Sequence, residues 1–418
     1  MSDLESAKQI LKKYNQEHLL GFYDELNKEE KEKLISQICD LDFEQILKLY
    51  DDSMFDEEID EKDITALDYV IKSKLSDNQI KEYKEIGEDI IMSGKYAVVT
   101  LAGGQGSRLG YKGPKGTYEL EFEPHKRSLF ELMCEQLHRA YEKYGVFINW
   151  YIMTSTENYS QTKNYFRKKN FFNYPEENIK FFTQSNLPLI DINKKLMLEE
   201  MHKIKVGANG NGDVFNSMLK HNILNDIERK KIEWVMFSGI DNVILDIVDP
   251  ILLGLTIKQE FEIASKSIFK SDPNNKEWVF AKHKGRPRII SPDYLSEKMK
   301  NEQFSDGRYK YREINILAHL FGIEALKKLS DVKLEYHRAF KKNTFINEEG
   351  MKQVPESPNS YKFENFIFDA FKYFKDMTIL EVEKNDEFAP IKDFNGPFNP
   401  EVAKNLYEAK QIKLKYEE

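Results

Sequence analysis

The sequence predicts an α/β fold in which a mixed, mostly parallel sheet carries helices on both faces. Two observations support this prediction. Short, nearly continuous apolar segments recur from Tyr96 to Ser267, as expected of strands buried on both faces. Segments with helical periodicity separate them, and this alternation favours parallel strands joined by helices.

The first 94 residues are predicted to form an N-terminal helical region. Leu4, Ala7, Ile10 and Leu11 recur at helical spacing, and a second such series runs over residues 34–49. No segment in this region has the pattern of a strand. The pattern changes at Lys95, so the region is expected to span residues 1–94.

Residues 95–372 are predicted to form the central α/β domain. Strands are expected at Tyr96–Ala102, Val146–Met153, Ile179–Thr183, Trp234–Ser238 and Glu262–Ser267. Helices are expected at Ser128–Tyr144, from a capping box at Thr154–Glu157 through Lys169, and from Asp213 to Glu228. Residues 373–418 are predicted to form a small C-terminal α+β domain, with a strand at Met377–Val382 and a helix after Pro400.

The composition excludes several classes of protein. The chain has 71 Asp and Glu residues and 62 Lys and Arg residues, so its net charge is −9. This negative charge argues against nucleic acid as a partner. The two cysteines, Cys39 and Cys134, cannot form a disulfide scaffold. The first residues carry charges where a signal peptide is apolar, and no apolar run approaches the ~20 residues of a membrane span. A cytoplasmic protein without a membrane partner is therefore expected.

The most informative segment is the glycine-rich loop that follows the first predicted strand. Four glycines fall within the eight residues Gly103–Gly110, which allows backbone N–H groups to converge on an anion. Arg108 and Lys115 can neutralise phosphate oxygens there. The spacing matches neither a P-loop nor a dinucleotide fingerprint, and a tight turn without a ligand is the structural alternative. At the carboxyl end of a parallel strand, the loop lies where open α/β sheets bind ligands.

Three further positions are candidates for ligand contact. Gln184 ends a predicted strand, and residues 208–213 contain two Asn-Gly pairs that by themselves indicate a turn. Asp241 follows the predicted strand Trp234–Ser238, a placement that suits Mg²⁺, which proteins bind through one or two carboxylates together with substrate phosphates. A helix cap is the alternative role for this aspartate.

The segment Leu101–Gly110, LAGGQGSRLG, followed by Pro114-Lys115-Gly116, resembles the signature of the sugar-1-phosphate nucleotidyltransferases. The sequence of this motif resembles that of the UTP-dependent branch of the family, which contains the UDP-N-acetylglucosamine pyrophosphorylases. Other segments follow in the family's order, including residues 150–155, 181–188, 210–212, 241–242, 305–308, 366–369 and 386–392. The resemblance implies a Rossmann-like nucleotidyltransferase fold, with UTP and a sugar 1-phosphate as substrates and Mg²⁺, or Mn²⁺, as cofactor.

The resemblance also implies a role for each candidate residue. The nucleotide would contact Leu101, Ala102, Gly103, Gly104, Gly106, Gln184 and Gly210, with the Gln184 amide at the uracil edge. The sugar would contact Asn211, Asn315, Phe366 and Phe368. Arg108, Lys115 and Lys392 would act on the phosphates as the catalytic cations, and Asp241 would hold the metal. Because the attacking phosphate is already an anion, alignment and charge neutralisation suffice and no side-chain base is required.

The expected sugar pocket departs from the family pattern. Ser291-Pro292 stands where N-acetylglucosamine members have a Glu-Tyr pair, and Arg312–Ile316 stands where they have Asn-Ala-Gly-Asn-Ile. Asn315 survives, but the Glu partner does not. N-acetylglucosamine 1-phosphate is the favoured substrate, and a UDP-glucose or broad UDP-sugar pyrophosphorylase is the alternative.

A non-catalytic binder of nucleotide sugars is a second alternative to the enzyme. The joint retention of Arg108, Lys115, Asp241 and Lys392 argues against it, because a binder could lose some of them. The sequence ends soon after the closing helix, and a monomer is expected.

Overall fold

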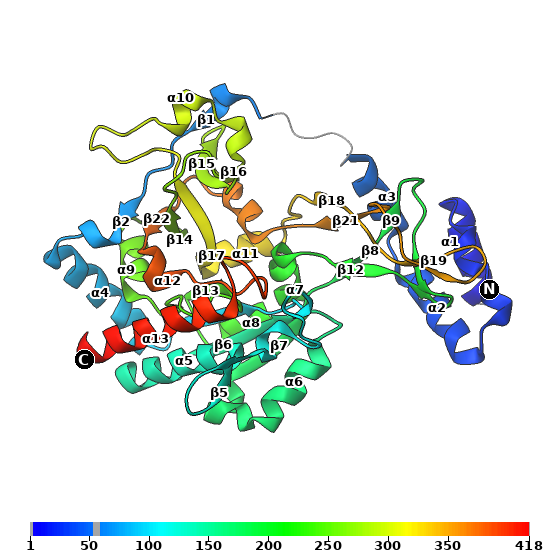
Figure 1. Ribbon diagram of the computed structural model, residues 1–418, viewed down its shortest axis with the longest axis horizontal. Coiled ribbons are helices and arrows are strands. Elements are labelled where there is room, and N and C mark those ends of the chain that lie inside the picture. Colours follow the sequence, from blue (N-terminus) through cyan, green and yellow to red (C-terminus); the bar gives the residue numbers. More distant parts are fainter. Residues whose placement is uncertain (1–2, 53–58, 418) are drawn as a thin grey trace. The chain divides into compact units, whose positions relative to one another are not determined.

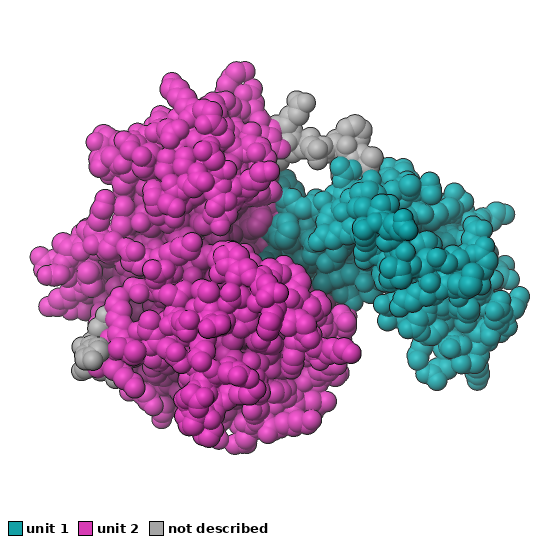
Figure 2. All heavy atoms as spheres, in the orientation of Figure 1, with its two compact units in different colours: residues 1–58, 185–213, 334–366 teal, residues 59–184, 214–333, 367–418 magenta. Residues whose placement is uncertain are grey.

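The computed structural model describes residues 3–52 and 59–417 and has two compact units, coloured separately in Figure 2. Unit 1 comprises residues 1–58, 185–213 and 334–366, and unit 2 comprises residues 59–184, 214–333 and 367–418. Each unit has its own apolar core. Over the described ranges, no helix combines the length and the apolar character needed to cross a membrane.

These units differ from the three predicted segments, 1–94, 95–372 and 373–418. Residues 59–94 belong to unit 2, and unit 1 recruits two later stretches of the chain. Periodicity along a sequence reports local structure only, so it does not reveal which distant segments share a core.

A mixed sheet forms the centre of unit 2 (Figure 1). Its strands lie in the order β2 (Val70–Ile71), β22 (Thr378–Glu381), β14 (Ile263–Phe269), β17 (Glu313–Gly322), β13 (Trp234–Gly239), β3 (Tyr96–Leu101), β6 (Asn149–Thr154) and β7 (Ile179–Thr183). The strands β13, β3, β6 and β7 pair in parallel, as do β2, β22 and β14. β17 runs antiparallel between the two sets. The predicted fold class, a mixed and mostly parallel sheet with helices, is confirmed.

Complete burial of the central strands explains their sequence pattern. Every residue of β3 and β6 is buried, so both strands have nearly continuous apolar sequences instead of alternating ones. The remaining strands of unit 2 are β1 (Ile64–Thr65), β4 (Glu119–Glu121), β5 (Lys126–Ser128), β15 (Val279–His283) and β16 (Arg286–Ile290). The prediction of a purely helical region over residues 1–94 is wrong at β1 and β2, because strands of two residues are too short to show alternation.

The helices of unit 2 are α4 (Asp77–Met92), α5 (Leu129–Tyr144), α6 (Tyr159–Lys168), α7 (Val214–Lys220), α8 (Ile223–Arg229), α9 (Pro250–Lys258), α10 (Glu297–Lys300), α11 (Ile323–Ser330), α12 (Lys384–Glu387) and α13 (Pro400–Glu417). Helices α4 and α9 cross unusually closely. A Cβ on Gly254 would lie 1.8 Å from the Tyr83 carbonyl oxygen, and one on Gly87 would lie 2.0 Å from that of Pro250. Glycine on both helices is what permits this contact.

Two predicted helices differ in detail from the structure. The capping box at Thr154–Glu157 is wrong, because Thr154 belongs to β6 and its hydroxyl donates to the Phe182 carbonyl oxygen. Ser155 and Asn158 form the reciprocal bonds instead, each backbone N–H donating to the side-chain oxygen of the other. The helix predicted from Asp213 to Glu228 is broken at Asn222, whose φ of 56° separates α7 from α8.

Unit 1 packs three helices against short strands from two later segments. The helices are α1 (Asp3–Lys13), α2 (Lys28–Asp40) and α3 (Phe43–Asp52). The strands are β8 (Asn186–Pro188), β9 (Ile190–Asp191), β10 (Leu198–Glu200), β11 (Lys203–Ile204), β12 (Val206–Ala208), β18 (His337–Lys341), β19 (Phe345–Ile346), β20 (Lys352–Gln353) and β21 (Ser360–Glu364). The core places Leu34, Ile38 and Phe43 of the helices with Ile190 and Phe363 of the strands. The predicted apolar periodicity of the helices therefore corresponds to their buried faces.

Candidate active site

The glycine-rich loop leaves the carboxyl end of β3 and folds back on itself. The Gly106 N–H donates to the Gly113 carbonyl oxygen over 2.9 Å, and the Lys115 N–H donates to that of Gly104 over 3.0 Å. The buried Asn158 amide donates to the carbonyl oxygens of Ala102 and Gly104. Gly104 itself is exposed, and no atom lies within 4 Å of the position that a Cβ would take. The loop thus has a fixed backbone with one open edge.

The predicted uracil reader, Gln184, lies against this loop. A Cβ on Gly103 would lie only 2.2 Å from the Gln184 Nε2 atom. Gln184 follows β7, its N–H donates to the Thr154 carbonyl oxygen over 2.8 Å, and the residue is 6% exposed. Because any side chain at position 103 would displace this amide, the contact requires glycine there.

Lys115 and Asp241 form an ion pair at the same edge of the sheet. The Lys115 Nζ atom lies 3.1 Å from Asp241 Oδ2, and the two side chains are 12% and 26% exposed. Asp241 follows β13, the parallel neighbour of β3, so the carboxyl ends of two adjacent strands bring these residues together. The structure therefore joins two of the sequence-predicted site residues that lie 126 positions apart.

A C-terminal segment, residues 387–392, runs beside Asp241. The Ile391 N–H donates to the Asp241 carbonyl oxygen over 2.9 Å. The buried Asn242 side chain donates to the Glu387 carbonyl oxygen and accepts from the Ala389 N–H. Lys392 follows directly, exposed, with its ammonium 4.8 Å from the Phe398 ring centroid. The backbone of this segment, not the Lys392 ammonium, makes the contact with the Asp241 stretch.

Arg108 lies at the exposed end of the glycine-rich loop and meets the same C-terminal segment. Its side chain is 71% exposed, and its guanidinium lies 4.0 Å from the carboxylate of Asp393, the residue after Lys392. The Phe394 N–H donates to the Arg108 carbonyl oxygen over 3.4 Å. The segments that carry the three predicted catalytic cations thus border one edge of the sheet.

Asn315 lies on β17 at an irregularity of the sheet. The pairing of β17 with β14 shifts between His319 and Asn315, and Leu317 has a φ of 56°. The Asn315 Oδ1 atom accepts from the Leu317 N–H over 2.7 Å and supports this conformation. Leu317 and the Asp241 carboxylate both flank Gly239, so the bulge borders the Asp241 stretch. Phe368, in the turn that follows unit 1, has its ring 6.3 Å from that of Trp278.

Glu313 is buried two residues before Asn315. Its Oε2 atom accepts from the Ser267 hydroxyl over 2.5 Å. Burial and the neighbouring Glu381 carboxylate raise the pKa of Glu313 well above its ordinary value.

Gly210, Asn211 and Phe366 belong to unit 1 and lie close together there. The Gly210 backbone packs on Asn365, whose N–H donates to the Asn209 carbonyl oxygen over 2.9 Å. The Gly212 N–H donates to the Asn365 carbonyl oxygen in turn. The Phe366 ring lies 5.0 Å from the ring of His337. These candidates therefore form a second group, separate in the chain from those of unit 2.

Sequence reasoning missed three polar residues that organise these loops. Asp213 accepts from the Ser185 N–H and from the Asn209 amide, while Asn158 and Asn242 make the contacts described above. All three residues are buried, and buried polar groups are hydrogen-bonded. Asn158 and Asp213 directly precede helices α6 and α7, but the sequence does not show which distant atoms these polar side chains bond.

Asp241 is the carboxylate at this site that could hold a metal. Within residues 3–52 and 59–417, no cluster of three or more His, Cys, Asp or Glu residues could hold an ion by protein groups alone. Mg²⁺ commonly takes one or two carboxylates and completes its shell with substrate phosphates and water. One carboxylate beside the glycine-rich loop fits a metal bound together with a nucleotide.

Comparison with known proteins decides the family. The model of the UTP–glucose-1-phosphate uridylyltransferase family matches residues 43–418. The chain belongs to this family. A UDP-N-acetylglucosamine pyrophosphorylase of Saccharomyces cerevisiae is 32% identical over 426 residues, covering 96% of this chain and 89% of the relative. The UDP-N-acetylglucosamine diphosphorylase 2 of Arabidopsis thaliana is 31% identical over 412 residues, covering 92% and 79%.

A solved structure shares the fold. It is the uridine diphosphate N-acetylglucosamine pyrophosphorylase of Trypanosoma brucei, with a TM-score of 0.80 and 24% identity, over 97% of this chain and 84% of that one. The predicted family, its enzyme class of nucleotidyltransferases and the predicted fold are confirmed.

Proposed function

We propose that this uridylyltransferase transfers the uridylyl group of UTP to N-acetylglucosamine 1-phosphate, releasing pyrophosphate. The observation that carries the proposal is the Lys115–Asp241 pair beside the open edge of the glycine-rich loop, with the Gln184 amide against Gly103. The relatives from yeast and Arabidopsis are named for UDP-N-acetylglucosamine, which supports this sugar.

The reaction needs alignment of two anions. A phosphate oxygen of the sugar 1-phosphate attacks the α-phosphorus of UTP and forms a new P–O bond. The bond from that phosphorus to the oxygen bridging the β-phosphate breaks, and pyrophosphate leaves with the electron pair. Arg108, Lys115 and Lys392 would offset the repulsion between the reacting anions and stabilise the charge on the leaving group.

The nucleotide would lie along the loop. Backbone groups of Leu101, Ala102, Gly103, Gly104 and Gly106 would contact it, and the Gln184 amide offers both a donor and an acceptor to the uracil edge. Gly210 is a further predicted contact of the nucleotide. Asp241 would hold Mg²⁺ or Mn²⁺, and a divalent ion, when bound, neutralises phosphate charge and orients the reacting groups.

The predicted contacts of the sugar are Asn211, Asn315, Phe366 and Phe368. Two of the residues that depart from the family pattern have structural roles here. The Ser291 hydroxyl accepts from the Asp293 N–H, and the buried Arg312 guanidinium donates to the carbonyl oxygens of Ser271 and Lys300. Since neither replaces the missing Glu-Tyr pair, a UDP-glucose or broad UDP-sugar pyrophosphorylase is the second candidate.

Pyrophosphate release separates these functions. The purified chain is incubated with UTP and, in turn, the 1-phosphates of N-acetylglucosamine, N-acetylgalactosamine and glucose, with ATP and chelator controls. The fastest release is expected with N-acetylglucosamine 1-phosphate and UTP, and none without divalent metal. A preference for glucose 1-phosphate would overturn the proposed substrate. Absence of release with every sugar would leave the non-catalytic binder as the better hypothesis.

A further inference from the structure

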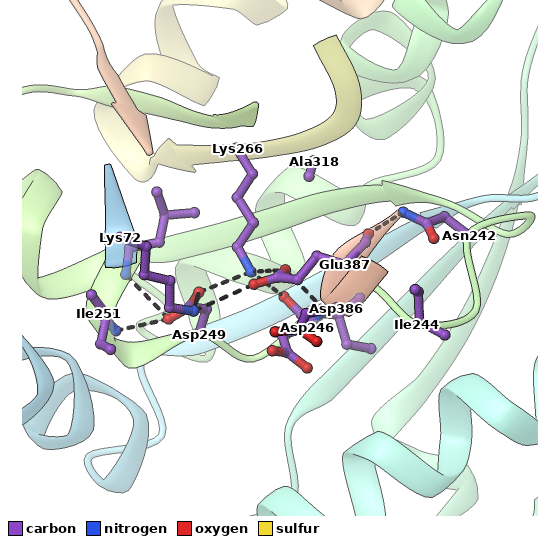
Figure 3. A network of polar contacts seen from close by, with 12 residues as sticks. Lys72, Asn242, Ile244, Asp246, Asp249, Ile251, Lys266, Ala318, Asp386 and Glu387 are labelled. Carbon is purple, nitrogen blue, oxygen red and sulfur yellow. Dashed lines mark hydrogen bonds and ion pairs between the residues drawn. The ribbon is translucent and has the colours of Figure 1, made fainter. Parts of the chain in front are cut away.

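Four charged side chains form a cluster at strand β14 (Figure 3), in which Lys266, Asp249 and Glu387 are buried and Lys72 is half-buried. Lys266 of β14 is fully buried, and its ammonium contacts the carboxylates of Asp249 and Glu387. Lys72 contacts the same two carboxylates at 3.0 and 3.3 Å. Each carboxylate therefore bridges both lysines, and the charges balance.

The cluster saturates the hydrogen bonds of its central lysine. Besides the two carboxylates, the Lys266 ammonium donates to the Asp246 carbonyl oxygen over 3.0 Å, which uses all three of its donors. Burial by itself would raise the pKa of Asp249, but Lys266 and Lys72 overcome this effect and hold the pKa well below its ordinary value. Because the two lysines and the two carboxylates contact one another, removing one partner would leave an uncompensated buried charge.

Glu387 links this cluster to the candidate active site. Its carboxylate lies in the cluster, while its own carbonyl oxygen accepts from the Asn242 amide over 2.8 Å. Asn242 also accepts from the Ala389 N–H, and Ile391 bonds Asp241. Only five positions separate Glu387 from Lys392. One buried anchor therefore fixes the start of the segment that ends at the exposed cation.

We infer that the Lys266–Glu387 contact positions Lys392 for the reaction. Lys392 is exposed, and its ammonium lies 4.8 Å from the centroid of the Phe398 ring, a contact that fixes the side chain only weakly. The anchoring comes from the backbone of residues 387–391, held at one end by Glu387. Lys266 and Glu387 are positioning residues in this account, which rests on the proposed uridylyl transfer.

The first test compares two buried carboxylates. Glu387→Gln keeps the shape of the side chain and removes its charge. The kcat for pyrophosphate release is expected to fall about tenfold, with little change in KM for UTP, because a misplaced catalytic group stabilises the transition state less well. Asp226→Asn is the matched control. Asp226 is also buried and pairs with Lys180, Arg229 and the Tyr151 hydroxyl, but it lies in α8 and does not contact residues 384–392. An equal fall in kcat for both variants, per folded molecule, would overturn the inference.

A double-mutant cycle tests whether the effect passes through Lys392. In a Lys392→Ala background, Glu387→Gln is expected to lower kcat by less than about twofold, because coupled residues are non-additive. The same tenfold fall in both backgrounds would contradict positioning through Lys392. Lys266→Met should give the same pattern.

Amide hydrogen exchange gives a readout that does not depend on activity. The amides of Ala389 and Ile391 are expected to exchange faster in Glu387→Gln than in the wild type, and to be unchanged in Asp226→Asn. Unchanged exchange in Glu387→Gln would overturn the inference. If the wild-type chain released no pyrophosphate, the proposed function would fail, while the exchange data would still report whether Glu387 anchors the segment.

Discussion

Two oppositely charged residues, Lys115 and Asp241, meet where the glycine-rich loop and strand β13 end. Such a pair suits a site for anionic substrates and a divalent metal, because the lysine can bind phosphates and the aspartate can bind the metal ion. Asp241 is also held by its backbone contact to Ile391. The geometry therefore places both groups before any ligand binds.

Lys115→Ala is expected to lower kcat by about 100-fold or more with the fold intact, since it removes a cation aimed at the charge of the transition state. Steady-state pyrophosphate release and circular dichroism measure the two effects. Lys112→Ala is the matched control, because Lys112 is exposed in the same loop. Near-normal turnover in Lys115→Ala would remove this residue from the mechanism.

Because Gly103 contacts Gln184, adding one methyl group at position 103 tests whether Gln184 determines the preference for UTP over CTP. Gly103→Ala puts a Cβ where the Gln184 Nε2 atom lies, so the amide must move. The ratio of kcat/KM for UTP to that for CTP is expected to fall at least tenfold, as for a lost base contact of about 1.4 kcal/mol. Ser107→Ala, in the same loop, should leave the ratio unchanged. A ratio equal to that of the wild type would show that Gln184 does not read the base.

At the level of single residues, the sequence identified the ends of strands but not the side chains that shape the loops there. Gln184 and Asp241 could be chosen because an apolar strand ends just before each one. Asn158, Asn242 and Asp213 could not, because their partners are backbone atoms brought near by the fold. The roles of the chosen residues stay predictions until the variants above are measured.

Among the secondary-structure elements, the buried strands were the most predictable. Strand β7 was predicted with the observed bounds, and β3 and β13 differ from prediction by one residue at an end. β3 and β13 are almost completely buried, so their sequences are mostly apolar, and β7 has three apolar residues among its five. The strands of unit 1 escaped prediction because most have only two or three residues.

The close crossing of α4 and α9 predicts a large cost for a small side chain. Gly254→Ala would place a methyl group 1.8 Å from the Tyr83 carbonyl oxygen, so the helices must separate. The free energy of unfolding is expected to fall by about 1–3 kcal/mol, as for an overpacked core, despite the better helix propensity of alanine. Urea unfolding measures the loss.

Lys258→Ala on the same helix is the control for this variant. Its ion pair with Glu82 is exposed, and exposed pairs contribute less than about 1 kcal/mol. If Gly254→Ala were as stable as the control, the helices would not pack as closely as described.

For the whole molecule, the least predictable property was the grouping of segments into units. The helices of unit 1 showed their apolar faces in the sequence, but nothing in residues 185–213 or 334–366 marked them as the strands that cover those faces. Local patterns describe each segment alone, whereas a shared core depends on contacts between distant ones.

The stability of the folded chain should decline in acid partly through His319. This residue is fully buried on β17, with its Nδ1 atom 2.9 Å from the Ser265 hydroxyl, and burial lowers its pKa to about 3. In the unfolded chain the pKa is about 6.5, so between these values the unfolded state binds the extra proton and stability falls as the pH falls.

His319→Gln should therefore lose about 2 kcal/mol less free energy of unfolding than the wild type between pH 6.5 and pH 4.5, whatever its stability at pH 7. Urea unfolding at several pH values measures the slope. Replacement of the exposed His125 by Gln serves as the control. Parallel curves for wild type and His319→Gln would contradict a buried neutral imidazole.

The three-part origin of unit 1 has a practical consequence for anyone who shortens this gene. No single continuous fragment of the chain contains one whole unit and nothing else, because the chain passes from one unit to the other five times. Deleting α1–α3 would leave Ile190 and Phe363 facing water, since these helices supply the rest of their core. A minimal version of unit 2 would instead have to join residue 184 to 214 and residue 333 to 367 through engineered links.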